Sequence, residues 1–179
     1  MPEYKALVNE TREVSDLGGT IAGKAAAERL GDVGSPNESL LAQWPDGSKN
    51  VNFDDVRRMT IDGQEVLVII ENKGGEAVLG KRIDASTNKY AQQGTPEYHY
   101  SLMESMGAKI KHLEKDPRNI PGSQFEAQLN DMTEMFSALQ DQPVRFYHVQ
   151  QKFDIHGNPA GVIVDRFPDI PINTNNTGG

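Results

Sequence analysis

The sequence predicts an α/β domain in which a mixed central sheet is flanked by helices, and three observations support this. The run Val66–Ile70 is apolar without alternation, as expected of a central strand covered on both faces. The pair Asp62-Gly63 separates two β-rich segments, which is a strong hairpin signal. Between residues 123 and 140, apolar residues recur at three- and four-residue steps, which indicates a helix with one buried face.

The chain begins with segments that carry weak signals. Residues 1–16 are polar, mixed in charge and without a sustained period, and we interpret them as a linker or N-terminal arm. The alanine-rich segment Thr20–Leu30 predicts a helix that ends at Gly31, because glycine commonly follows the last helical residue. Residues Gly34–Ser39 have the composition of a turn.

The strand group follows. We predict a strand over Val51–Thr60, a turn over Ile61–Gln64 and a second strand over Glu65–Ile70. The pair Gly74-Gly75 ends this region. From Glu76 to Gly94 the composition indicates a loop.

Two helices and two strands are predicted in the second half of the chain. The first helix starts at Thr95, a good N-cap followed by proline, and is expected to end at Met106 before Gly107. The second extends from Ser123 to Gln140, and its Ser123 and Glu126 form a capping-box pattern.

After Pro143 the chain returns to strands. Val144–Phe153 and Ala160–Phe167 predict a hairpin across Ile155–Pro159. Residues 169–179 are rich in Pro, Asn and Gly and predict a flexible tail. A single folded domain is therefore expected over residues 17–168.

Composition limits the classes of function. A chain of 179 residues suits one domain, and it contains no apolar run long enough to span a membrane. The absence of cysteine excludes disulfides and thiolate metal sites. The net charge of −8 argues against nucleic-acid binding by charge alone, although residues 71–118 are close to neutral. Carboxylates can instead bind a divalent cation.

The clearest candidates for catalytic residues follow the apolar strand. Glu71 and Lys73 are two residues apart, so their side chains project from the same side of a strand. A carboxylate on the neighbouring strand, either Asp54 or Asp55, could join them, and periodicity alone does not decide which. Such a set could hold Mg²⁺ for hydrolysis of a phosphodiester. The simpler alternative is a solvated strand end with a surface ion pair.

Three blocks of sequence carry a resemblance to a known family. The chain resembles the nuclease domains found at the C-termini of bacterial polymorphic toxins, within the restriction-endonuclease-like PD-(D/E)xK superfamily. There a strand reads like V-V-x-E-x-K-G-G and is followed by a leucine-glycine turn and by Q-Q-G-T-x-x-Y. The matching blocks are Val68–Gly75, Leu79-Gly80 and Gln92–Tyr98. The resemblance implies a restriction-endonuclease-like core with the order α-β-β-β-α-β.

The resemblance also implies roles for individual residues. Asp54 and Glu71 become metal ligands, Lys73 the catalytic lysine, and the carbonyl of Asn72 a further ligand. A glutamate from the first helix often joins the metal site in this superfamily. Glu28 is the candidate here, although Lys24 occupies another position where a glutamate would fit. The predicted contacts to substrate phosphate or water are Gln92, Gln93, Thr95, Lys81 and Arg82. His148 is interpreted as an ordinary strand histidine.

The expected function is a Mg²⁺- or Mn²⁺-dependent nuclease that cuts DNA. The resemblance implies a toxin secreted as part of a larger effector, acting in the cytoplasm of a competing bacterium and blocked by a cognate immunity protein. Two alternatives stay open. The same fold could cut RNA or tRNA, or it could be an interaction module that has lost catalysis.

Overall fold

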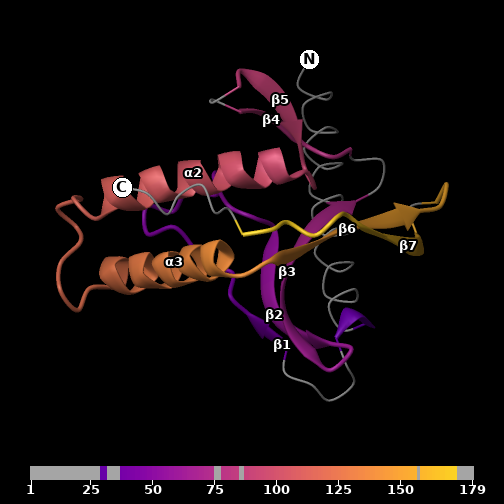
Figure 1. Cartoon of the computed structure of the whole chain (residues 1–179), viewed down its shortest axis with the longest axis horizontal. Helices are drawn as coiled ribbons and strands as arrows, with labels where there is room; N and C mark the ends of the chain where they lie inside the picture. The colour runs from indigo at the N-terminus through magenta and orange to yellow at the C-terminus, as the bar shows by residue number, and fades with distance from the viewer. Residues whose placement is uncertain (1–28, 32–36, 75–77, 85–86, 157, 173–179) are drawn as a thin grey trace.

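The computed structural model describes residues 29–31, 37–74, 78–84, 87–156 and 158–172. Within them it confirms a mixed α/β arrangement with a mixed central sheet and two long helices (Figure 1). The main sheet has the strand order β1-β2-β3-β6-β7, and β4 and β5 form a separate two-stranded ribbon. The candidate ligand Glu28, the alternative position Lys24 and most of the first predicted helix lie outside the described residues.

The predicted hairpin forms the centre of the sheet. Strands β2 (Asp55–Ile61) and β3 (Gln64–Gly74) pair antiparallel across the Asp62-Gly63 turn. Both turn residues have positive φ, 54° and 72°, as expected for the tight turn that suits the twist of a hairpin. Strand β3 continues four residues beyond its predicted end, because β6 pairs along its whole second half.

The strand boundaries near β1 differ from the prediction. Residues Asn37–Ser39, predicted as part of a turn, form the short edge strand β1 beside β2. The first residues of the predicted strand at Val51 lie outside β2, and Val51 itself has a φ of 59°. Both boundaries depend on pairing with a segment that is distant in the chain, and local composition does not predict this pairing.

Strands β6 (Val144–Phe153) and β7 (Pro159–Arg166) confirm the second predicted hairpin. Strand β6 lies parallel to β3, with Glu71 opposite His148 in the register. Parallel neighbours need a long crossover connection, and here that connection contains both helices. Beyond β7, Ile170 is buried and exchanges backbone hydrogen bonds with Val144 of 2.8 and 3.0 Å, so the chain returns to the sheet edge.

Helices α2 (Pro96–Leu113) and α3 (Gln124–Asp141) lie side by side against one face of the sheet (Figure 1). Their N-caps are Thr95 and Ser123, as predicted. The predicted end of α2 at Met106 is wrong. The helix passes through Gly107 because Ile110 and Leu113 belong to the core, and Gly107 itself lies against the ring of Phe136 on α3.

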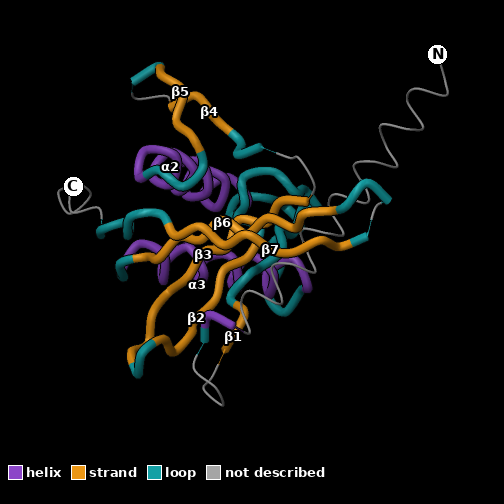
Figure 2. Tube along the Cα trace, turned by 90° about the vertical axis from the view of Figure 1, so that its right-hand side faces the viewer, coloured by secondary structure: helices purple, strands orange, loops and turns teal. Residues whose placement is uncertain are grey.

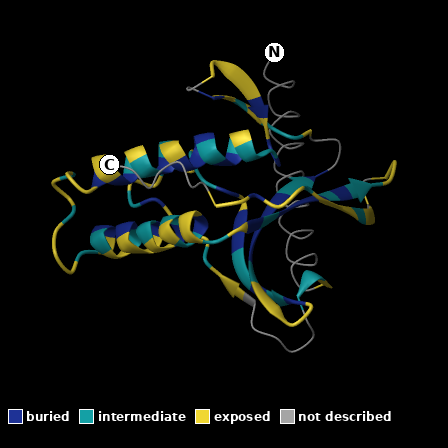
Figure 3. Cartoon of the chain, viewed as in Figure 1, coloured by how far each residue is buried: buried dark blue, intermediate teal, exposed yellow. Residues whose placement is uncertain are grey.

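The two faces of the sheet carry separate apolar clusters. On the helix face, Val56, Leu67, Ile69 and Phe146 pack with the apolar sides of α2 and α3. The opposite face holds a smaller cluster whose buried members are Met59, Ile61, Val68, Ile70, Tyr147 and Val149. Figure 3 shows the resulting buried centre of the sheet. A side chain that projects from the helix face but is not covered by α2 or α3 therefore lies at the margin of the core.

The ribbon of β4 (Lys81–Asp84) and β5 (Lys89–Gln92) corrects the loop predicted between Glu76 and Gly94. It extends past the start of α2 and away from the main sheet (Figures 1 and 2). Most of its residues are exposed, so it lacks the alternating apolar pattern by which strands are recognised. Within the described residues, no helix is long and apolar enough to cross a membrane.

Candidate active site

Asp54 and Glu71 stand next to each other on the helix face of the sheet. The register pairs Asp55 with Ile70, so Asp54, the residue before β2, faces Glu71. Residues opposite each other on antiparallel strands project to the same face. Asp54 Oδ2 also accepts a hydrogen bond of 3.0 Å from the backbone N–H of Asn72, which fixes the carboxylate against the end of β3.

Lys73 lies between the two carboxylates. Its Nζ is 2.9 Å from Glu71 Oε1 and 3.9 Å from Asp54 Oδ2. The three side chains therefore form one cluster in which a single positive charge is shared by two acids. The Asp54 side chain is 41% exposed and the Glu71 side chain only 4%, so the cluster opens to solvent at Asp54.

The electrostatics of this cluster are strained. Burial, followed by the negative charge of Asp54, raises the pKa of Glu71 from its ordinary 4.5 to about 7, although Lys73 opposes the change. Burial alone would lower the pKa of Lys73, but the attraction of Glu71 outweighs it and the pKa is raised. Lys73 therefore stays an ammonium ion, and any further cation nearby would stabilise the ionised form of Glu71.

Gln93 joins the cluster to the β4–β5 ribbon. Its Nε2 donates to Glu71 Oε1, and its Oε1 accepts from the backbone N–H of Gly80 at the start of the ribbon. A Cβ on residue 80 would lie 2.9 Å from Gln93 Oε1, so glycine leaves the room that the carboxamide occupies. Gln93 was predicted to contact substrate. The structure places it directly on Glu71.

The other predicted substrate residues at the start of α2 have local roles. The Thr95 hydroxyl accepts from the N–H of Tyr98 at 3.3 Å and donates to the carbonyl of Gln92 at 2.7 Å, which caps the helix. The Gln92 side chain is exposed. Tyr98 is half-buried, and burial followed by the charge of Glu71 raises its pKa, so its hydroxyl stays protonated beside the cluster.

The predicted phosphate contacts on the ribbon differ from each other. Lys81 is exposed, and its Nζ lies 4.7 Å from the centre of the Tyr90 ring, which is also exposed. Arg82 faces α2 instead, where its Nη2 donates to Ser105 Oγ at 2.6 Å. Lys81 is therefore available to a ligand in solution, whereas Arg82 is engaged with the helix.

Asp55 and the Asn72 side chain project to the opposite face. Asp55 Oδ2 accepts a 2.8 Å hydrogen bond from Arg57 Nε, so this carboxylate has a partner remote from Glu71. The Asn72 Oδ1 is buried and without a hydrogen-bond partner. The role predicted for the Asn72 carbonyl as a metal ligand stays a prediction.

Two further residues share the face of Glu71. In the register, β6 places His148 beside Glu71, and β7 places Asp165 beside His148. Neither residue was predicted to belong to the site. The signal that reveals them is the parallel pairing of β3 with β6, which joins residues more than 70 positions apart in the chain.

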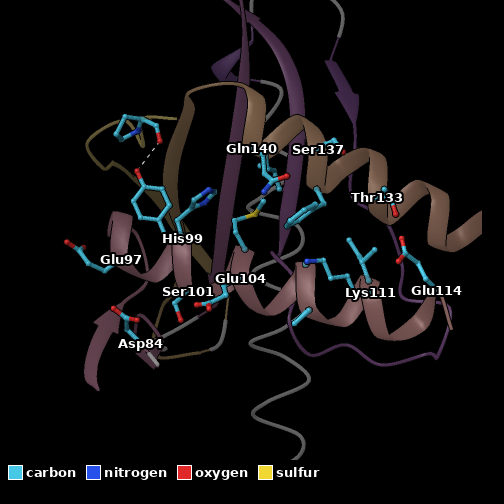
Figure 4. A pocket seen from close by; sticks show the side chains of 18 residues that line it. Asp84, Glu97, His99, Ser101, Glu104, Lys111, Glu114, Thr133, Ser137 and Gln140 are labelled. Carbon is cyan, nitrogen blue, oxygen red and sulfur yellow. Dashed lines mark hydrogen bonds between the residues drawn. The ribbon is translucent and has the colours of Figure 1, made fainter. Parts of the chain in front are cut away.

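A separate cavity of about 980 Å³ lies along α2 and α3 (Figure 4). None of the described residues predicted for the active site lines it. Its charged side chains are acidic apart from Lys111 and include Glu97, Glu104 and Glu114, all labelled in Figure 4. An acidic lining repels a phosphate backbone, so the cavity does not compete with the Glu71 cluster as a nucleic-acid site.

The available carboxylates suit Mg²⁺, which takes ligands from water and substrate, better than a metal ion whose ligands all come from the protein. Across the described part of the chain, no group of three or more Asp, Glu or His side chains is close enough to hold a metal ion. Mg²⁺, however, commonly uses one or two carboxylates and takes its other ligands from water and substrate phosphate. Asp54 and Glu71 supply two carboxylates, and the unfavourable charge at Glu71 favours a cation there.

Comparison of the chain with protein-family models, curated proteins and solved structures found no match. The geometry defines a class of site: one buried and one exposed carboxylate that share a lysine at the end of a central strand.

Proposed function

We propose that this protein is a metal-dependent nuclease that hydrolyses phosphodiester bonds, with DNA as the expected substrate. The observation that carries the proposal is the cluster of Asp54, Glu71 and Lys73, in which one ammonium ion is shared by two carboxylates. A buried acid with a raised pKa at the margin of a core also supports the proposal, because perturbed pKa values cluster at functional sites.

The fold proposed for this function is a restriction-endonuclease-like core. Strands β1, β2 and β3, then helices α2 and α3, then β6 follow the β-β-β-α-β part of the implied order. The β4–β5 ribbon is an insertion in this order, between β3 and α2. The helix that would precede β1 falls on residues outside the described part of the chain.

Each residue of the cluster would have its own role in the reaction. Asp54 and Glu71 would hold Mg²⁺, which when bound polarises the phosphate and lowers the pKa of water. Lys73, held as an ammonium ion, would stabilise the negative charge that develops on the phosphate oxygens. Gln93 would keep the Glu71 carboxylate in place.

The overall step is a hydrolysis. The water oxygen forms a bond to phosphorus while the bond from phosphorus to the leaving oxygen breaks. The products are a phosphate monoester and a hydroxyl, and the proton lost by water reaches the leaving oxygen through solvent. The role of toxin domain, with delivery by a larger effector and inhibition by an immunity protein, belongs to the same proposal and rests on the sequence blocks around Glu71 and Gln93.

The test is incubation of the purified chain with supercoiled plasmid and with total RNA, each in Mg²⁺ and in EDTA. Metal-dependent loss of plasmid is expected, and loss of RNA alone would make the protein an RNase. Glu71→Ala should lower the rate by about 100-fold or more. Glu65→Ala, at the exposed far end of the same strand, serves as the matched control. Equal cleavage by the parent and Glu71→Ala, or none by the parent, would refute the proposal.

A further inference from the structure

Four side chains that can bind a metal ion or exchange a proton form one row across the sheet. Asp54 faces Glu71, the register of β3 and β6 pairs Glu71 with His148, and the register of β6 and β7 pairs His148 with Asp165. Paired residues on neighbouring strands project to the same face of a sheet. The row therefore continues the Asp54–Glu71 site by two residues, away from β2 and toward the β7 edge.

His148 has an unexplained nitrogen. The residue is 8% exposed, and its Nε2 is buried without a hydrogen-bond partner. A buried polar atom without a partner costs roughly 1–3 kcal/mol, so its presence needs a reason beyond packing. Phe146, two residues earlier and on the same face of β6, is buried and apolar, so this face of the strand accepts an apolar side chain.

The other ring nitrogen indicates how the imidazole is oriented. His148 Nδ1 lies 3.6 Å from Asp165 Oδ2, an electrostatic contact slightly longer than a hydrogen bond. In the uncharged ring, a proton on Nδ1 facing this carboxylate leaves a lone pair on Nε2. His148 then offers a hydrogen-bond acceptor.

The acceptors in the rest of the site are the two carboxylates, which the proposed function assigns to the metal ion. Lys73 has three donors and no acceptor. Glu71 Oε1 already accepts from Lys73 and Gln93, and Asp54 Oδ2 accepts from the N–H of Asn72. A water that attacks phosphorus needs an acceptor for one of its hydrogens to point its lone pair at the phosphorus.

We propose that His148 is a further residue of the active site, whose Nε2 accepts a hydrogen bond from the attacking water, and that Asp165 is the positioning residue for its ring. This inference rests on the proposed nuclease function. It adds strands β6 and β7 to the site and gives β7, otherwise an edge strand, a part in the reaction.

The matched variants are His148→Gln and His148→Met. The two new side chains are similar in size and flexibility, but only glutamine carries a strong acceptor. His112→Ala, on the exposed last turn of α2, controls for loss of a histidine. The measurements are kcat and KM on a labelled oligonucleotide in Mg²⁺, the Kd for the same oligonucleotide in EDTA, and the melting temperature.

His148→Met should lower kcat by about 100-fold, within the range for groups that assist proton movement, while KM and Kd stay within about twofold. His148→Gln should recover about tenfold of that loss, and Asp165→Ala should lower kcat by about threefold to tenfold. Equal kcat values for His148→Gln and His148→Met would overturn the inference, as would a rise in Kd that accounts for the whole effect.

The two proposals fail differently. If the parent does not cleave nucleic acid, the nuclease function itself is refuted. If the parent cleaves, Glu71→Ala is inactive and His148→Met retains the parent's kcat, only the role of His148 is wrong.

Discussion

Replacing Glu71 with glutamine should remove a pH dependence of the free energy of unfolding. The pKa of Glu71 rises from 4.5 to about 7 on folding, first because the carboxylate is buried and then because Asp54 repels its charge. Between these two pH values the folded protein binds more protons than the unfolded chain. The free energy of unfolding therefore falls as the pH rises through this window.

The magnitude follows from the size of the pKa change. Each tenfold change in proton affinity corresponds to about 1.4 kcal/mol, so Glu71 should cost about 3 kcal/mol of stability once the pH exceeds 7. Glutamine has nearly the same shape, keeps an oxygen that can accept from Lys73, and does not titrate.

The assay is urea unfolding of the parent and Glu71→Gln in EDTA at pH values from 4.5 to 8. His99 contributes an opposite slope, because burial lowers its pKa to about 4, but that slope is common to both proteins. The difference between parent and variant isolates Glu71. It should change by about 3 kcal/mol in favour of the variant across the range. Parallel pH profiles would refute the electrostatic account of the cluster.

Magnesium extends the same experiment. A cation bound to Glu71 favours its ionised form and stabilises only the folded state. At pH 8, adding Mg²⁺ should raise the urea midpoint of the parent and leave that of Glu71→Gln unchanged. An equal rise in both proteins would locate the cation elsewhere.

The remaining predictions concern other parts of the fold. Asp54→Asn should lower kcat for nucleic-acid cleavage by about 100-fold or more, whereas Asp55→Asn, on the opposite face beside Arg57, should change kcat by less than about threefold; similar losses in both would contradict the register. As pH falls from 6.5 to 4, the free energy of unfolding of His99→Leu should rise relative to that of the parent by about 3 kcal/mol in urea titrations, because protonation of the buried imidazole destabilises only the parent; a constant difference between the two proteins would contradict this assignment to His99. Gly94→Ala should lower the free energy of unfolding by about 3 kcal/mol or more, because its φ is 88° and a Cβ would lie 2.7 Å from the Phe167 ring. Gly63→Ala, with a φ of 72° and nothing within 4 Å, should cost only about 1 kcal/mol, and equal costs would mean that the Phe167 ring moves freely.

Local signals predicted those elements whose determinants lie close together in the chain. The start of α3 is an example: Ser123 Oγ accepts from the N–H of Glu126 at 3.1 Å, as its capping pattern indicates. The β2–β3 turn is another, because Asp62-Gly63 provides the two positive φ values that the turn needs.

Elements decided by tertiary packing were missed. Gly107 indicated a helix end, yet it lies within α2 because the helix approaches Phe136 of α3 closely there. The β4–β5 ribbon was predicted as a loop, since a short and mostly exposed strand pair shows no apolar alternation.

The same distinction between local signals and tertiary pairing applies to the candidate site. The two-residue spacing of Glu71 and Lys73 places them on one side of a strand, and the structure joins them at 2.9 Å. The choice between Asp54 and Asp55 needed the register of β2 against β3. His148 needed the parallel pairing of β6, for which the sequence offers no local signal.

The most direct test of the central claim is a crystal of the protein soaked in Mn²⁺, with anomalous scattering used to locate the ion. One strong peak is expected between the carboxylates of Asp54 and Glu71, with Lys73 displaced from between them, and the peak should vanish in Glu71→Gln. Manganese bound elsewhere, or a cluster that keeps its Lys73 bridge and excludes the ion while the protein still cleaves nucleic acid, would contradict the account.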